Sequence, residues 1–125
     1  MRGNTLYYNG AFDTLNSPWR GPNKAVGISA KHVGFMTIEN NIIVCRSKEY
    51  SAFAVWDNSV TTVTNNFLQD CSVSLRTPAV NTVEGDPMFR SPNVDLRMAD
   101  FRLSENSLAS GYGAETLVQC NNSIK

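Results

Sequence analysis

Short apolar runs return along the chain at a fixed spacing. A pair of asparagines begins at Asn40 and again at Asn65, 25 positions later, and each pair precedes an apolar run. Residues 27–43 placed over residues 52–68 align two apolar or β-branched runs separated by a polar gap. Alternation lasts three to five residues at a time, without the 3.6-residue stripe of a helix. The pattern predicts an all-β chain of stacked repeats.

The same pattern divides the chain into segments of one domain, residues 1–125. Residues 27–51 and 52–75 are the clear repeats, and residues 84–125 carry a different pattern that we assign to closing coils and a cap. Residues 11–26 are rich in turn formers and lengthen the first interval, so they are predicted to be an inserted loop. Loops on a rigid scaffold often carry function.

Charge gives no case for nucleic acid or an anionic membrane as a partner, because eleven basic residues balance eleven acidic ones. The neutral balance permits self-association, and a short stack of strands has open ends, so we expect a homo-oligomer. The N-terminal residues lack the apolar run of a secretory signal. We therefore expect a cytoplasmic protein, or an extracellular one if the chain is a fragment of a longer protein.

The three cysteines, Cys45, Cys71 and Cys120, lack the spacing of a metal site. Reduced, partly buried thiols are the favoured interpretation. A Cys45–Cys71 bridge is the alternative, because the 25-residue offset places Cys45 over Asp70, next to Cys71. No cofactor motif is found, since Gly111-Tyr112-Gly113 is too short for a phosphate loop.

Two features resemble the right-handed parallel β-helix family, the pectin-lyase-like solenoids. Asn40 and Asn65, with Asn4 as a third member, resemble the asparagine ladder of that family, since asparagine tolerates left-handed backbone angles and its amide can bond the next rung. The second feature is similar to the family's closing coils, and comprises Asp86-Pro87-Met88-Phe89, Asp100-Phe101-Arg102-Leu103 and Ser107-Leu108-Ala109. The resemblance implies a short right-handed parallel β-helix of about four to five coils, with one inserted loop and a C-terminal cap.

One candidate catalytic pair follows from the repeat. The 25-residue offset places Asp57 on His32, the only histidine, so the two could act as a general base with its orienting carboxylate. A surface ion pair is the favoured interpretation of the same pair.

A candidate binding platform combines aromatic residues with an arginine. Aromatic faces bind the apolar side of a sugar ring, while polar groups bind its hydroxyls. The residues that could form the platform are Trp19, Arg20, Tyr8 and Trp56. Trp19 folding back to anchor its own loop is the favoured alternative.

The sequence predicts a non-catalytic module that binds a carbohydrate or a protein through the inserted loop and one sheet face. One alternative is a fragment of a polysaccharide lyase or glycoside hydrolase, although the family's catalytic patterns are not found. Another is a purely structural assembly protein. An acidic pair over an aromatic groove would favour the enzyme, and a large self-complementary face would favour assembly.

Overall fold

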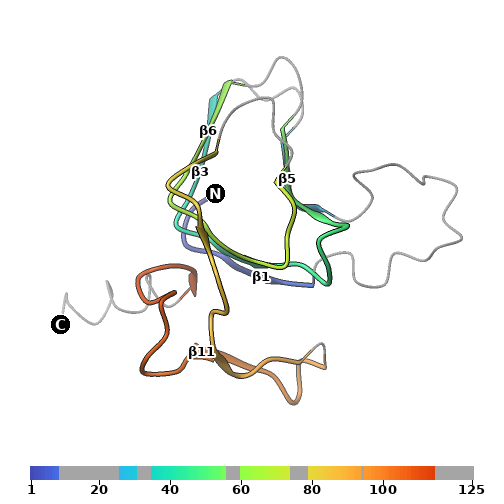
Figure 1. Ribbon diagram of the computed structural model, residues 1–125, viewed down its shortest axis with the longest axis vertical. Helices are drawn as coiled ribbons and strands as arrows, with labels where there is room; N and C mark the ends of the chain where they lie inside the picture. Colours follow the sequence, from blue (N-terminus) through green and yellow to red (C-terminus); the bar gives the residue numbers. More distant parts are fainter. Residues whose placement is uncertain (9–25, 31–34, 56–59, 74–78, 94, 115–125) are drawn as a thin grey trace, which may run out of the picture.

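The computed structural model describes residues 1–8, 26–30, 35–55, 60–73, 79–93 and 95–114 (Figure 1). In these segments the secondary structure is all β. The strands are β1 (Thr5–Tyr7), β2 (Val26–Ala30), β3 (Phe35–Glu39), β4 (Ile42–Val44), β5 (Ser51–Val55), β6 (Val60–Thr64), β7 (Phe67–Gln69), β8 (Ala79–Val80), β9 (Val83–Glu84), β10 (Phe89–Ser91) and β11 (Asp100–Leu103). Within the same segments, no helix has the length and apolar character needed to cross a bilayer.

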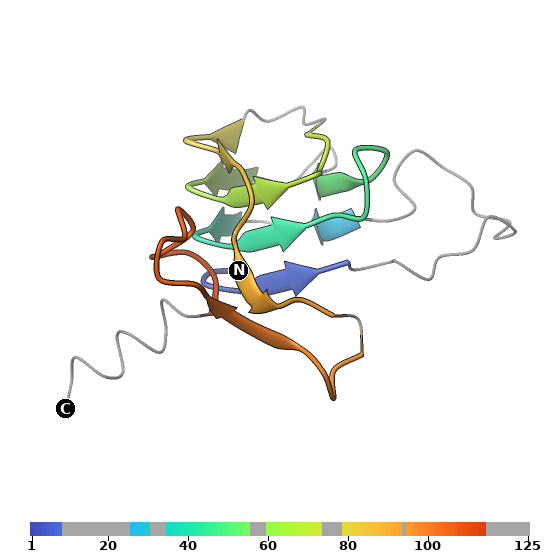
Figure 2. The same cartoon turned by 60° about the horizontal axis from the view of Figure 1, so that its bottom comes forward.

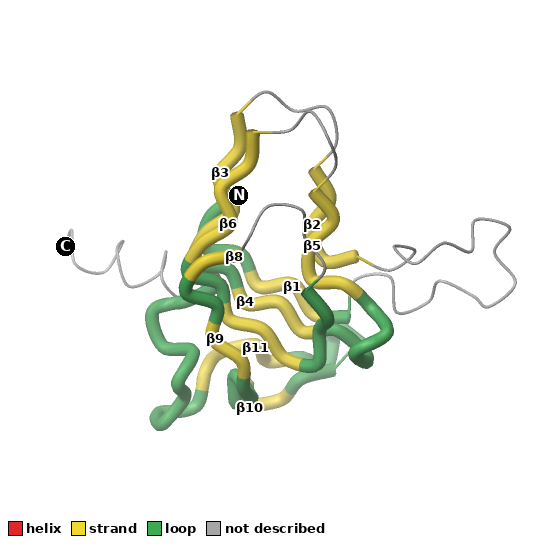
Figure 3. The backbone as a smooth tube through the Cα atoms, turned by 45° about the horizontal axis from the view of Figure 1, so that its top comes forward, coloured by secondary structure: helices red, strands yellow, loops and turns green. Residues whose placement is uncertain are grey.

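Three short parallel sheets lie around one core (Figure 3). The largest has the strand order β1-β4-β7-β9, the second β3-β6-β8, and the third contains only β2 and β5. Sharp corners separate the sheets, and the turn between β3 and β4, like that between β6 and β7, contains only an asparagine pair. Each strand is therefore short, and consecutive strands from β1 to β9 lie in different sheets.

The strand register confirms the 25-residue offset over the two clear repeats. Ile28 pairs with Phe53, and Ile42 pairs with Phe67. The offset shortens beyond β7, because Phe67 pairs with Val83, 16 positions later. Parallel pairing therefore continues past the second repeat, with a shorter stretch of chain between partner strands.

Side chains that point inward from the three sheets form the first apolar cluster. Leu68 and Ile43 are each 1% exposed and lie side by side on β7 and β4. Burial of large aliphatic and aromatic side chains stabilises a fold by roughly 1.5–3 kcal/mol each. The cluster contains Ile28, Ile38, Ile43, Cys45, Ala52, Phe53, Val63, Leu68 and Cys71.

The outer face of the largest sheet is also buried. The antiparallel pair β10–β11 crosses this face (Figure 2), and Phe89 and Leu103 pack with Ile42 and Phe67 in a second apolar cluster. All three residues of β4 are consequently buried. The continuous apolar run of β4 follows from this double coverage, because a strand with one wet face would alternate apolar and polar residues.

The prediction of a short right-handed parallel β-helix of four to five coils is wrong. The described strands form four short, separate sheets, one of them antiparallel, and do not extend into a solenoid. Only residues 26–44 and 51–69 supply a strand to all three parallel sheets. The prediction that the C-terminal segment caps the end of the stack is also wrong. Its strands β10 and β11 cover the outer face of a sheet. The predicted inserted loop lies almost entirely outside the described residues.

Candidate functional site

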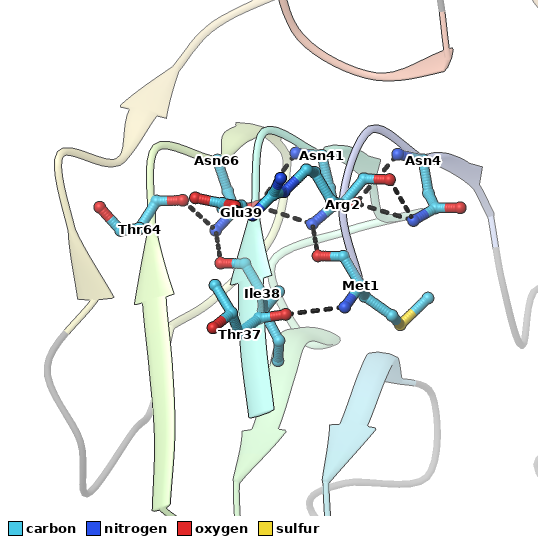
Figure 4. Close-up of polar contacts among 9 residues, drawn as sticks. All are labelled: Met1, Arg2, Asn4, Thr37, Ile38, Glu39, Asn41, Thr64 and Asn66. Carbon is cyan, nitrogen blue, oxygen red and sulfur yellow. Dashed lines mark hydrogen bonds and ion pairs between the residues drawn. The ribbon is translucent and has the colours of Figure 1, made fainter. Parts of the chain in front are cut away.

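The amino ends of the largest sheet carry a ladder of asparagine side chains (Figure 4). The amide nitrogen of Asn4 donates to Oδ1 of Asn41 at 3.1 Å, and that of Asn41 donates to Oδ1 of Asn66 at 2.9 Å. The backbone N–H groups of Asn4 and Asn41 donate to the same oxygens. Asn41 and Asn66 are fully buried, so this ladder is a structural element and offers nothing to a ligand.

The predicted ladder was Asn4, Asn40 and Asn65. In the structure Asn4 is a rung as predicted, but the other two rungs are the next residues along the chain, Asn41 and Asn66. Asn40 and Asn65 precede the rungs and adopt left-handed backbone angles, with φ of 55° and 53°. Gly3 occupies the corresponding position before Asn4, with φ of 65°. Glycine favours this conformation, so Gly3 was the sequence signal that the first residue of each pair makes the turn and the second makes the ladder.

The carboxyl ends of the same strands bring together residues that are far apart in sequence. Tyr7 pairs with Val44, Val44 with Gln69, and Leu68 with Glu84. One or two positions further along, the chain places four residues at matching points: Tyr8, Cys45, Asp70 and Asp86. Neighbouring strands lie ~4.8 Å apart, so these residues form one row across the end of the sheet.

This row borders two neighbouring cavities of about 270 Å³ each, which we call together the groove. Gln69, Asp70 and Asp86 line both cavities. The first cavity is completed by Tyr7, Tyr8, Val44, Met88, Phe89 and Pro92, and the second by Lys48, Leu68, Cys71, Glu84 and Gly85. The groove therefore has an aromatic end and a charged end.

The aromatic end is a stacked tyrosine pair. The rings of Tyr7 and Tyr8 are nearly parallel, with centroids 4.1 Å apart and an interplanar angle of 10°. Phe101 and Phe89 support Tyr7 with ring centroids at 5.1 and 6.3 Å. Burial of the Tyr7 hydroxyl, together with its hydrogen bond to Tyr8 and the Tyr8 charge, raises the pKa of Tyr7 to about 12. Tyr7 is thus neutral at physiological pH and holds Tyr8 in place.

The acids at the groove differ from those of the β10–β11 hairpin. In the hairpin, Asp95 pairs with Arg97 at 3.0 Å and Asp100 with Arg102 at 2.8 Å, and the second pair lowers the pKa of Asp100 to about 2. Across the described segments, no ion pair joins Asp70, Glu84 or Asp86 to another side chain.

Those groove acids are exposed, and two of them have defined local geometry. Asp86 accepts a hydrogen bond from the backbone N–H of Met88 at 2.7 Å through Oδ1. Asp70 adopts a left-handed backbone with φ of 53°. The carboxylates are therefore held at the groove by local backbone features.

A disulfide joins Cys45 and Cys71 beside the groove, with the two Cα atoms 5.1 Å apart. Both residues are buried, at 6% and 4% exposed. The favoured expectation of reduced thiols is wrong for these two residues, and the bridge suggested by the 25-residue offset is the one observed. Cys120 lies outside the described residues.

Of the predicted platform, only Tyr8 falls in the part of the chain that the structure describes, and it lines the groove. The other predicted site residues lie outside it, namely Trp19, Arg20, His32, Trp56 and Asp57. The sequence analysis does not bring Asp70 and Asp86 together, because they are 16 positions apart and do not match under the 25-residue offset. An asparagine at position 81, before the short run Val83–Glu84, was the signal of a shortened repeat.

Comparison with protein-family models, with curated proteins and with solved structures gave no match to this chain. Among the described residues, no group of three or more histidine, cysteine or acidic side chains is arranged to hold a metal ion. The groove's geometry and chemistry are consequently the basis for assigning a function.

Proposed function

We propose that this protein is a carbohydrate-binding module whose ligand lies in the groove at the carboxyl ends of β1, β4 and β7. The single observation that carries the proposal is the register that places Tyr8, Gln69, Asp70 and Asp86 along one open groove. A sugar ring presents apolar C–H groups on its faces and hydroxyls at its edges, and this combination of side chains offers partners for both.

The tyrosine pair supports this assignment. Tyr7 stacks on one face of Tyr8 and is itself packed against phenylalanines, so Tyr8 is presented on a rigid base. Tyr8 also lines the groove, where an aromatic ring can stack on a sugar. Preorganising an aromatic side chain lowers the entropy that binding costs.

Binding, and not hydrolysis, is the activity that the acids support. Asp70 and Asp86 form an acidic pair near an aromatic ring, the arrangement expected of a glycoside hydrolase. A glycosidase needs one carboxyl group with a raised pKa, which burial in an apolar pocket provides. Both aspartates are exposed, and Asp86 already caps its own turn. These features favour hydrogen bonding to hydroxyls.

The test is isothermal titration with three hexasaccharides that differ in charge: cellohexaose, the glucosamine hexamer of chitosan, and hexagalacturonate. We expect measurable binding, with hexagalacturonate the weakest, because Asp70, Glu84 and Asp86 outnumber the one groove cation, Lys48. Tyr8→Ala should weaken binding about tenfold through loss of the stacking contact.

Phe35→Ala is the matched control, because Phe35 is an aromatic residue that is 92% exposed on β3, in another sheet. Equal losses for Tyr8→Ala and Phe35→Ala, or no binding of any hexasaccharide, would reject the groove as a carbohydrate site. Shortened products by mass spectrometry would instead show that the acidic pair is catalytic.

A further inference from the structure

We propose that the Cys45–Cys71 disulfide controls ligand binding at this groove by holding Asp70 in its left-handed conformation, so that only the oxidised protein binds with full affinity. The proposal rests on the proposed function for the identity of the ligand. The structural part of it, the coupling between the disulfide and Asp70, stands on the geometry of the chain alone.

The disulfide lies within the row of residues that forms the groove. Cys45 follows β4 and, by the strand register, lies between Tyr8, which follows β1, and Asp70, which follows β7. Cys71 lines the charged end of the groove and follows Asp70 directly. A change at this bond therefore acts on the middle of the groove.

Asp70 is the groove residue directly beside this bond. Its φ of 53° lies in the left-handed region, which aspartate adopts more readily than most residues with a Cβ atom but less readily than glycine, so the local structure decides whether it persists. Several constraints follow Asp70 immediately. One is the disulfide at Cys71. The others are at Ser72, whose N–H donates to the carbonyl of Tyr50 at 2.9 Å, whose carbonyl accepts from the N–H of Ala52 at 3.0 Å, and whose hydroxyl donates to the carbonyl of Tyr50 at 3.0 Å.

Strand pairing alone gives little support at this point. β4 and β7 are three residues long and end at Val44 and Gln69, before the disulfide. One backbone bond, from the N–H of Cys45 to the carbonyl of Gln69 at 3.0 Å, extends the ladder past the strands. Without the covalent link, only the hydrogen bonds at Cys45 and Ser72 flank Asp70, and we expect its backbone to relax locally towards an extended conformation that takes the carboxylate out of the groove.

The redox step is a thiol–disulfide exchange with a dithiol reductant. The reductant supplies two electrons and two protons, the S–S bond breaks to give thiols on Cys45 and Cys71, and the reductant closes to its own disulfide. Both cysteines are nearly buried, so exchange requires a local opening of the chain and is slow. Disulfides persist in oxidising compartments, so the oxidised form is the one expected there.

The experiment compares oxidised and dithiothreitol-reduced protein in a Cys120→Ser background, which prevents exchange with the third cysteine. The probe is the tightest binding of the three hexasaccharides. We expect reduction to weaken binding about tenfold, the effect of losing one hydrogen bond to a charged group. Asp70→Ala should weaken binding by the oxidised protein by the same factor, and reduction of that variant should cause no further loss. Tyr8→Ala should weaken binding by both the oxidised and the reduced protein.

A second measurement needs no ligand. Amide hydrogen exchange at Ser72 and the NMR coupling constant that reports φ at Asp70 should both change on reduction, while exchange in β3 and β6 stays unchanged. An unchanged φ at Asp70, or additive losses for Asp70→Ala and reduction, would overturn the proposal. Global unfolding on reduction would overturn it as well, since the proposed effect is local. Failure of every hexasaccharide to bind rejects the proposed function and leaves the coupling at Asp70 to this second measurement.

Discussion

The two ends of the largest sheet show opposite uses of the same strand register. At the amino ends, Asn4, Asn41 and Asn66 stack as amides that bond one another, and Asn41 and Asn66 are shielded from solvent. At the carboxyl ends, Tyr8, Asp70 and Asp86 also occupy matching positions but face an open groove. Stacking therefore creates a row of similar positions at each end, and burial decides whether that row stabilises the fold or contacts a ligand.

The difference has a chemical basis. An asparagine amide donates and accepts, so each amide can be satisfied by the next in a buried row. Ionised carboxylates only accept, and a buried row of them would be unpaired and costly. Acids at matching positions are thus tolerated at an exposed end, where water solvates them and a ligand with hydroxyl donors can replace that water.

The largest expected effect tests the buried end. Asn66→Ala removes the acceptor of both Asn41 donors and leaves the carbonyls of Ile38 and Thr64 without their amide partner. Because these groups are buried, we expect a loss of about 3 kcal/mol in the free energy of unfolding. Urea denaturation followed by circular dichroism measures it.

Asn65→Gly is the control for that variant, because glycine keeps the left-handed turn that Asn65 makes. We expect its unfolding free energy to stay within about 0.5 kcal/mol of the parent protein. If the two substitutions had equal effects, the ladder would not be the source of the stability.

A smaller effect is expected from extending the ladder. Thr82 follows Asn81, which has φ of 54°, so Thr82 occupies the fourth rung position. Its hydroxyl is buried and has no hydrogen-bond partner among the described residues. Thr82→Asn places an acceptor next to Asn66 and should raise the free energy of unfolding by about 1 kcal/mol in the same denaturation assay. Thr82→Val removes the hydroxyl without adding a rung, and a gain as large for valine would contradict the ladder explanation.

The smallest effect concerns the exposed end at high pH. The pKa of Tyr7 is raised to about 12 in the folded protein, against an ordinary value of 10.0. Between these two pKa values, Tyr7 keeps its proton in the folded state and loses it in the unfolded state. Its contribution to the free energy of unfolding is therefore complete below pH 10 and disappears as the pH rises towards 12. Ultraviolet titration of tyrosinate should show one late-ionising group, and Tyr7→Phe should abolish it. Ordinary titration of every tyrosine would show that the stacked pair opens in solution.

Sequence reasoning located the repeats because burial enforces a register. Ile28 over Phe53 and Ile42 over Phe67 are pairs that a slip of one residue would turn to the wrong face of the sheet. The ladder was assigned one residue early at Asn40 and Asn65, since both members of an asparagine pair fit a left-handed turn and an amide ladder equally well.

The groove was harder to find from sequence, because it depends on a change in the repeat. The chain between β7 and β9 is nine residues shorter than the preceding repeat, so Asp86 comes beside Asp70 without matching it in the alignment. The outer coverage by β10 and β11 was missed for a related reason. Apolar residues such as Phe89 and Leu103 predict burial, but their spacing does not indicate which surface they cover.

The placement of β1 has a consequence for the order in which the protein folds. The hydroxyl of Thr5 accepts a hydrogen bond from the N–H of Ala114, 109 residues away, and Gly113 lies where a Cβ atom would be 2.6 Å from that hydroxyl. Contacts between such distant residues form slowly, because a long chain must first close on itself. β1 pairs with β4 in any case, but its contacts with Gly113 and Ala114 form only when the last described segment folds onto it, so a chain truncated before residue 113 leaves this part of β1 uncovered.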